Sequence, residues 1–156
     1  MRIAMLGTRG IPAAYSGFET AVEHLAERFS ALGHDVTVYC RTHMTDRRAT
    51  YAGARLVHLP TIRSKHLDTL AHTLLSTAHL AARERPDVAI YFIAGNAPAA
   101  PLARLAGIPA ILQIDGLDSE RAKWSRPARA YLRLAERLAP SAATIAVTDS
   151  QAVADV

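Results

Sequence analysis

The sequence predicts an α/β fold, a doubly wound and mostly parallel sheet with helices on both of its faces. Short apolar runs that suit β-strands alternate along the chain with segments whose apolar residues recur at helical spacing. The run Val88–Ile93 is apolar without interruption, which is typical of a parallel strand covered on both faces. With 156 residues, half of them hydrophobic, the chain can bury one full core. A single domain over residues 1–150 is therefore expected.

The first strand and the first helix flank a glycine-rich loop. Ile3–Leu6 is a short apolar run compatible with a strand. A helix is expected over Gly17–Leu32, because apolar side chains recur on one face at Val22, Leu25, Ala26, Phe29 and Leu32. Gly33 suits the left-handed conformation that follows a helix end, so the helix should stop there.

The middle of the chain continues the alternation of strand and helix. Buried strands are predicted over Val36–Cys40 and Arg55–Leu59, with a polar loop from Arg41 to Tyr51 between them. A helix is expected within residues 66–85, where one face carries Leu67, Leu70, Ala71, Leu74, Leu75, Ala78 and Ala82. Pro86 limits how far that helix can extend.

The second half of the chain shows the same pattern after Val88–Ile93. A sharp loop at Gly95–Pro98 leads into a short helix that ends at Gly107. Strands are predicted over Pro109–Ile114 and Thr144–Val147. The helix between them should span Pro127–Ala139, with its apolar positions at Tyr131, Leu132, Ala135 and Leu138.

The segment Gly7–Glu19 has the composition of a phosphate-binding loop. At a helix N-terminus the first N–H groups lack a partner within the helix and the macrodipole is positive, so an anion is stabilised there. The glycines at positions 7, 10 and 17 allow positive φ angles and a close approach of ligand to backbone. Alternatively, the segment is a tight connection in which Ser16 caps the helix and Glu19 completes a capping box. Both interpretations can hold together.

Three polar loops are expected to meet at one edge of the sheet. In doubly wound sheets, ligands bind beyond the carboxyl ends of the strands, where the strand order reverses. The loops Gly7–Gly17, Gly95–Pro98 and Asp115–Asp118 all follow predicted strands. We therefore expect these loops to form one cleft.

Several classes of nucleotide or metal site lack their signature. A dinucleotide site requires Gly-x-Gly-x-x-Gly after the first strand and an acidic residue after the second, but here Gly7-Thr8-Arg9-Gly10 and Arg41 occupy these places. No Gly-Lys-Ser/Thr follows the first strand, which excludes a P-loop. The seven histidines have no metal-ligand spacing, so no metal site is expected. Arg41 could still favour a 2′-phosphate, which leaves a stand-alone NADP- or nucleotide-binding, flavodoxin-like module as the alternative.

Charge and cysteine content narrow the possible partners. The net charge of +4 favours anionic partners, but no motif for nucleic-acid recognition is present. No window approaches the ~18 apolar residues of a membrane span. Cys40 is the single cysteine, which excludes an intrachain disulfide and fits a reducing cytosol. We expect a cytoplasmic protein.

The motifs of the chain resemble a known family. Gly7-Thr8-Arg9-Gly10-Ile11-Pro12 followed by Ser16-Gly17-Phe18-Glu19-Thr20 resembles the N-terminal domain of GT-B glycosyltransferases of family 4, in particular the rhamnosyltransferase-like branch. The resemblance covers nearly the whole chain and continues in Val36–Arg41, Gly95–Pro98, Asp115-Gly116-Leu117, Arg121–Trp124 and Asp149-Ser150. It implies a Rossmann-like domain that mainly binds the acceptor. Ser16 stands where the family usually has the first glycine of a Gly-Gly pair.

The resemblance also implies roles for individual residues. Backbone N–H groups at Gly10, Ser16 and Gly17 would lie against the diphosphate of a sugar donor. Asp115 would hydrogen-bond the donor sugar or the acceptor hydroxyl, or accept a proton, although an Asp-Gly turn explains it as well on sequence grounds. The acceptor would contact Arg9, Gly116 and Asn96, and Asn96 could instead only close a turn.

The implied activity is sugar transfer without a cofactor or metal. The resemblance implies a nucleotide-sugar donor, with a rhamnosyl nucleotide as the first candidate, and a polysaccharide or a lipid-linked glycan as acceptor, with retention of configuration. The family's donor domain and its Glu-x7-Glu motif are absent from this sequence, so residues 151–156 would begin the connection to it. We therefore expect the 156 residues alone to transfer no sugar.

A basic stripe on the last predicted helix is a candidate membrane contact. Arg126, Arg129, Arg133 and Arg137 recur on one helix face next to apolar positions, which suits the anionic inner face of a membrane. Such a stripe can equally be a solvated face. Peripheral membrane contact therefore stays open.

Overall fold

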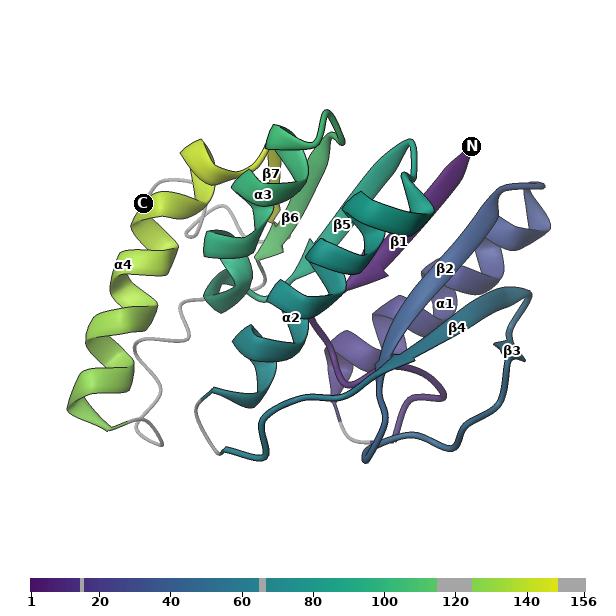
Figure 1. Ribbon diagram of the computed structural model, residues 1–156, viewed down its shortest axis with the longest axis horizontal. Helices are drawn as coiled ribbons and strands as arrows, with labels where there is room; N and C mark the ends of the chain where they lie inside the picture. The colour runs from purple at the N-terminus through teal and green to yellow at the C-terminus, as the bar shows by residue number, and fades with distance from the viewer. Residues whose placement is uncertain (15, 65–66, 115–124, 149–156) are drawn as a thin grey trace.

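The computed structural model describes residues 1–14, 16–64, 67–114 and 125–148. Within these ranges the strands form one seven-stranded sheet in the order β3-β4-β2-β1-β5-β6-β7 (Figure 1). Every neighbouring pair is parallel except β3 with β4. The predicted doubly wound, mostly parallel sheet is confirmed, and the fold is Rossmann-like.

The elements follow the predicted alternation closely. The strands are β1 (Arg2–Leu6), β2 (Asp35–Arg41), β3 (Thr50–Tyr51), β4 (Ala54–Leu59), β5 (Val88–Phe92), β6 (Ala110–Ile114) and β7 (Ile145–Thr148). The helices are α1 (Gly17–Ala31), α2 (Asp68–His79) with its π-helical extension η1 (Leu80–Glu84), the 3₁₀-helix η2 (Ala94–Ala99), α3 (Ala100–Leu105) and α4 (Arg126–Ala142). β3 was not predicted, because it lies at the end of the stretch Arg41 to Tyr51, whose polar composition indicated a loop.

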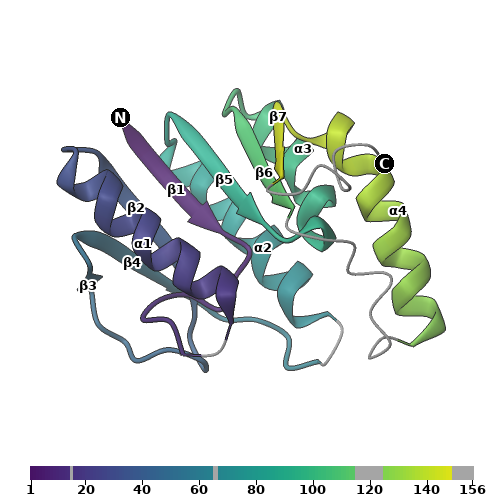
Figure 2. The same ribbon diagram turned by 180° about the vertical axis from the view of Figure 1, so that it is seen from behind.

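The helices cover the two faces of the sheet unequally. α1 lies on one face (Figure 2), and α2 and α3 lie on the other (Figure 1). The chain moves from β1 to β2 in one direction along the sheet and from β4 through β5 to β7 in the opposite direction. Because crossovers between parallel strands are right-handed, these two directions place their helices on opposite faces.

Alternation along the strands divides the apolar side chains into two cores. In β1, Ile3 and Met5 belong to the core on the α1 side, and Ala4 and Leu6 belong to the core on the α2 side. The second core is rich in small residues of η2, α3 and α4, namely Ala94, Ala97, Ala99, Ala100, Ala103, Ala135, Ala139 and Ala142. Small side chains allow these helices to pack closely against the sheet.

The predicted apolar face of α2 is only partly right: Leu74 packs against the core, but polar residues occupy the most buried positions. Leu67 and Leu75 are exposed, whereas His72, Thr73, Ser76 and Thr77 are buried against the sheet. The burial of the threonines costs little free energy because their hydroxyls have partners: Thr73 and Thr77 each donate to the carbonyl four residues earlier, at 2.8 Å. Periodicity assigned the core face to leucines, whereas the hydrogen bonds of His72, Thr73 and Thr77 allow these three polar side chains to lie there.

Two other predicted core leucines are also exposed. Leu32 is the C-cap residue of α1, one position beyond the helix, and Gly33 follows with a φ of +83°. The predicted stop at Gly33 is confirmed. Leu138 lies on the outer side of α4, because Ala135 and Ala139 occupy the side that faces the core.

The ends of β1 and β5 meet where the strand order reverses. Gly7 follows β1, and Asn96 lies in η2, which follows β5. The Asn96 side chain is fully buried, and its Nδ2 donates to the carbonyl oxygens of Gly7 at 3.1 Å and Phe92 at 2.7 Å. Two of the three loops therefore meet at their buried ends, and the common cleft expected between them stays a prediction. The third, Asp115–Asp118, lies outside the described residues.

Gly7→Ala should destabilise the fold by roughly 2–5 kcal/mol. Gly7 has a φ of +104°, and a Cβ atom there would lie 2.6 Å from the Phe92 carbonyl oxygen and 2.7 Å from Asn96 Nδ2. Urea denaturation of the two proteins measures the difference in the free energy of unfolding.

Gly33→Ala is the matched control for this substitution. Gly33 also has a positive φ, but a Cβ atom there would meet nothing within 4 Å. Its cost should be only the backbone term for an L-residue at positive φ, roughly 1–2 kcal/mol. Equal costs at the two positions would contradict the close approach described for Gly7.

Candidate functional site

The glycine loop between β1 and α1 is held against the end of β2. Gly10 has a φ of +112°, and a Cβ atom there would lie 2.5 Å from Cys40 Sγ. The Gly10 N–H donates to Thr8 Oγ1 at 3.3 Å, and the Arg41 N–H donates to the Arg9 carbonyl at 2.9 Å. Close contact with β2 therefore accounts for the glycine at position 10. Its predicted contact with a donor diphosphate stays a prediction.

The N-terminus of α1 is open to solvent. Ser16 and Gly17 are exposed, and a Cβ atom on Gly17 would meet nothing within 4 Å. The first i→i−4 bond of the helix is made by Thr20, whose N–H donates to the Ser16 carbonyl at 3.2 Å. The N–H groups of Gly17 and Phe18 precede that bond and have no carbonyl to reach within the helix. This geometry allows a ligand to approach the backbone.

The predicted capping box at this helix start is present. Glu19 Oε2 accepts from the Ser16 N–H at 3.1 Å, and the carboxylate is almost completely buried. Arg9 Nε lies 3.9 Å from Glu19 Oε1, and about a third of the Arg9 side chain (34%) is exposed. Both interpretations of the loop are therefore compatible with one geometry, in which the cap uses side chains and leaves the front of the helix accessible.

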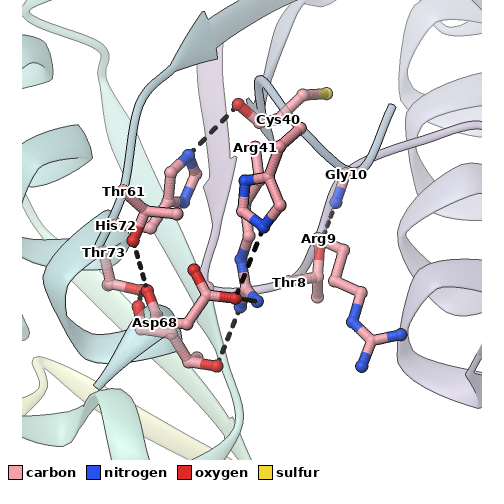
Figure 3. A network of polar contacts seen from close by, with 12 residues as sticks. Thr8, Arg9, Gly10, Cys40, Arg41, Thr61, Asp68, His72 and Thr73 are labelled. Atoms are coloured by element: carbon pink, nitrogen blue, oxygen red, sulfur yellow. Dashed lines mark hydrogen bonds and ion pairs between the residues drawn. The ribbon is translucent and has the colours of Figure 1, made fainter. Parts of the chain in front are cut away.

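A polar network lies beside the loop, at the ends of β2 and β4 (Figure 3). The Arg41 guanidinium is buried and donates to Asp68 Oδ2 at 2.7 Å and to Thr69 Oγ1 at 2.8 Å. Burial lowers the pKa of Arg41, and the neighbouring Asp68 carboxylate opposes that shift. An enclosed and paired guanidinium is not presented to a 2′-phosphate, so Arg41 gives no support to the NADP-binding alternative.

His72 links this network to the backbone of β2. Its ring is fully buried, and Nε2 lies 3.1 Å from the Cys40 carbonyl, which can only accept a hydrogen bond. Burial, and then the positive charge of Arg41, lower the pKa of His72 to about 4. The imidazole is therefore neutral at physiological pH and donates its Nε2 proton to β2.

The sequence analysis did not identify Asp68 and His72 as part of the site. They lie four residues apart, on one face of the first turns of α2. An acidic residue and a histidine four positions apart at a helix start, directly after a strand and loop, are the sequence pattern that could have identified the pair. Their partner Arg41 is 27 residues away from Asp68, so only the tertiary structure reveals the network.

The remaining predicted site residues are placed as follows. Asn96 is buried beneath the loop rather than exposed beside it, so its predicted contact with an acceptor stays a prediction. Asp115 and Gly116 lie outside the described residues. In the predicted stripe on α4, Arg126, Arg133 and Arg137 are exposed, whereas Arg129 is half-buried.

Neither a metal site nor a membrane-spanning helix is found among the described residues. No cluster of His, Cys, Asp and Glu within these ranges could hold a metal ion. None of the helices described is long and apolar enough to cross a membrane.

The free energy of unfolding should decrease as the pH is lowered from 6.5 to 4, because His72 is buried in its neutral form. Its pKa is about 6.5 in the unfolded chain and about 4 when folded, so the unfolded chain binds more protons within this window. Stability then rises with pH through the window and is constant above it, with a total contribution of up to about 3 kcal/mol. Chemical denaturation at several pH values measures it.

His72→Gln should reduce this pH dependence, since the amide does not titrate. The carboxylates also titrate in this range, so the comparison is made between variant and parent. His24→Gln, at an exposed position of α1, is the control and should keep the parent's slope. An unchanged slope in His72→Gln would contradict a buried neutral imidazole.

Comparison with solved structures shows the fold in larger proteins. Similar structures include a protein from Listeria monocytogenes described as a UDP-N-acetylglucosamine 2-epimerase (13% identity, covering 99% of this chain and 40% of that chain, TM-score 0.60). Sucrose-phosphate synthase from Thermosynechococcus elongatus is also similar (17%, 88% and 39%, TM-score 0.58), as is the glycotransferase of kitacinnamycin (22%, 90% and 40%, TM-score 0.56). At these identities the likeness concerns the fold alone. The chain spans about two fifths of the length of these structures.

Comparison by sequence identifies the family. No curated protein matches the chain significantly. Residues 16–156 match the model of the glycosyl transferase 4-like domain, from the N-cap of α1 to the last residue of the sequence. The match includes α1, the Arg41 network and η2. The chain belongs to the glycosyl transferase 4-like domain family.

Proposed function

We propose that this chain is the acceptor-side domain of a GT-B glycosyltransferase that uses a nucleotide sugar as its donor. Family membership supports the transferase class. The observation that carries the ligand assignment is the N-terminus of α1, where Ser16 and Gly17 are exposed and the space beyond the Gly17 Cα is open. Phosphate oxygens of the donor accept hydrogen bonds from the N–H groups there, and the helix dipole stabilises their charge.

The names and ligands of similar structures support a nucleoside diphosphate as the donor's leaving group. One similar structure, LpCGTa, was determined in complex with UDP (15% identity, TM-score 0.53). Others are epimerases whose names contain UDP-N-acetylglucosamine. UDP is therefore a suitable first probe for the N-terminus of α1.

The finer assignments of the proposal follow from the motif resemblance. Asp115 acts on the donor sugar or the acceptor hydroxyl, with Gly116 and Arg9 near the acceptor, and Gly10 near the diphosphate. The transfer retains configuration without a metal ion, and rhamnose is the first candidate sugar. The acceptor is a polysaccharide or a lipid-linked glycan. A second domain supplies the other wall of the donor site, so transfer belongs to a polypeptide longer than these 156 residues.

UDP should bind at Gly17 with millimolar affinity, because one wall of the site is present. In ¹H–¹⁵N spectra, titration with UDP should shift the amide signals of Gly17 and Phe18. Gly17→Glu should weaken this binding at least about tenfold, since a carboxylate in front of the helix repels phosphate.

Ala31→Glu is the matched control, because Ala31 is the exposed last residue of the same helix. It adds the same charge at the far end and should leave the affinity for UDP unchanged. Undiminished UDP binding by Gly17→Glu would overturn the assignment of the diphosphate to this helix end.

We also propose that α4 contacts an anionic membrane surface at the cytoplasmic side. On its outer face, Leu134 and Leu138 are exposed next to the exposed Arg133 and Arg137. Each pair is spaced by four residues, so the four side chains form one continuous patch of basic and apolar character. Such a patch can insert its leucines between lipids while its arginines attract anionic headgroups.

Binding to vesicles that contain phosphatidylglycerol should depend on these arginines. Each arginine contributes roughly 1 kcal/mol near an anionic surface. The double variant Arg133→Gln with Arg137→Gln should therefore have a vesicle partition coefficient, measured by sedimentation, that is about thirtyfold lower than the parent's. Arg28→Gln with Arg83→Gln, two exposed arginines on other elements, is the control. Equal sedimentation with neutral and anionic vesicles would remove this contact.

A further inference from the structure

A shallow depression lies between the glycine loop and the loop that follows β2. It has a volume of about 180 Å³ and is lined by Arg9, Gly10, Pro12, Ala14, Glu19, Met44 and Thr45. Pockets that enclose drug-sized ligands have volumes of roughly 300–1,000 Å³, so this depression suits only a small ligand. That is the scale of one sugar ring rather than of an extended chain.

The walls of this depression are held in place by hydrogen bonds. The Ala13 N–H donates to Glu23 Oε2 at 2.6 Å, which ties the segment between Pro12 and Ala14 to α1. The Arg41 N–H holds the Arg9 carbonyl at 2.9 Å. Thr45 Oγ1 donates to the Arg41 carbonyl at 3.2 Å on the opposite side. A ligand would therefore meet a site that is already formed.

The chemistry of the lining is mixed. Met44 and Ala14 are exposed and Pro12 is half-buried, so one side of the depression is apolar. Figure 3 shows the Arg9 side chain extending away from the Arg41 network. A guanidinium offers several N–H donors to oxygen acceptors. Sugar rings present both features that such a site recognises, hydroxyl oxygens at the ring edge and C–H groups on the ring face.

The charge of the lining distinguishes a sugar from a phosphate. Glu19 is also part of the wall, and its Oε1 lies 3.9 Å from Arg9 Nε. This carboxylate offsets the positive charge of Arg9, so an incoming phosphate would gain little and would face a negative group. A neutral polyhydroxyl ligand has no such disadvantage.

We infer that this depression, named here the Arg9–Met44 depression, binds one neutral sugar unit of the acceptor. The inference rests on the proposed function and deepens it, since it gives the acceptor a saccharide terminus and places that terminus beside the loop. The donor diphosphate lies in front of Gly17, and the acceptor sugar lies behind the loop against Met44. Gly10 is the glycine that brings these walls close to β2.

The methyl group of Met44 is a direct probe of the site. The sequence has three methionines, Met1, Met5 and Met44, and Met5 is fully buried in the core. With ¹³C-methyl-labelled methionine, a panel of methyl glycosides (rhamnose, glucose, galactose and N-acetylglucosamine) is titrated into the chain. At least one glycoside should shift the Met44 signal at millimolar concentration and leave Met5 unchanged. Inorganic pyrophosphate should not shift Met44.

Two variants test the site in different ways. Arg9→Gln removes the guanidinium donors and should weaken the glycoside affinity about tenfold. Ala14→Trp fills the depression from an exposed position and should abolish the Met44 shift, with thermal denaturation confirming an intact fold. Arg28→Gln, at an exposed position near the end of α1, is the control and should bind like the parent.

The outcomes separate this inference from the proposed function. A Met44 shift with pyrophosphate and none with glycosides would overturn the sugar site in favour of an anion site. Displacement of the glycoside by UDP would overturn its assignment to the acceptor. If UDP shifts the Gly17 amide signal and no glycoside shifts the Met44 methyl signal, the inference fails and the diphosphate assignment stands. If glycosides bind and UDP does not, the sugar site stands and the diphosphate assignment fails.

Discussion

The hydrogen bonds of one buried carboxamide hold the candidate site together. Asn96 Nδ2 joins the carbonyls of Gly7 and Phe92, which end β1 and β5. These two strands are neighbours at the point where the strand order reverses, so their ends must be joined for the loops beyond them to meet. Two buried carbonyls without donors would carry a desolvation cost, which the amide removes. Only glycine at position 7 leaves room for this arrangement.

A second set of buried polar groups connects the loop to the other half of the sheet edge. Arg41 donates to Asp68 through its side chain and to the Arg9 carbonyl through its backbone. His72 adds a contact to the Cys40 carbonyl. A buried ion pair is costly to desolvate, and its value here lies in geometry, since it keeps α2, β2 and the glycine loop in one relative position. The network is thus structural support for the loop.

Next to these buried groups, two neighbouring parts of the surface differ in chemistry: the N-terminus of α1 and the Arg9–Met44 depression. The N-terminus of α1 presents backbone N–H groups and a positive dipole, which suit an anion. The Arg9–Met44 depression pairs an arginine with a carboxylate beside apolar side chains, which suits a neutral polar ligand. The proposed sugar transfer would use both kinds of surface, because its donor carries phosphates and its acceptor presents a hydroxyl. Gly10 and the residues around it separate the two.

The sequence alone determined the order of elements, the parallel sheet and the place of the loops, because these depend on local periodicity and on glycine and proline positions. It also predicted the capping box and the helix end at Gly33, which are local features. Only the tertiary structure decided which face of α2 is buried, that Asn96 lies under the loop, and that Arg41 is paired with Asp68. Each of these depends on contacts with residues many positions away, which local periodicity does not encode: His72 of α2 contacts the Cys40 carbonyl, Asn96 donates to the Gly7 carbonyl, and Arg41 donates to Asp68.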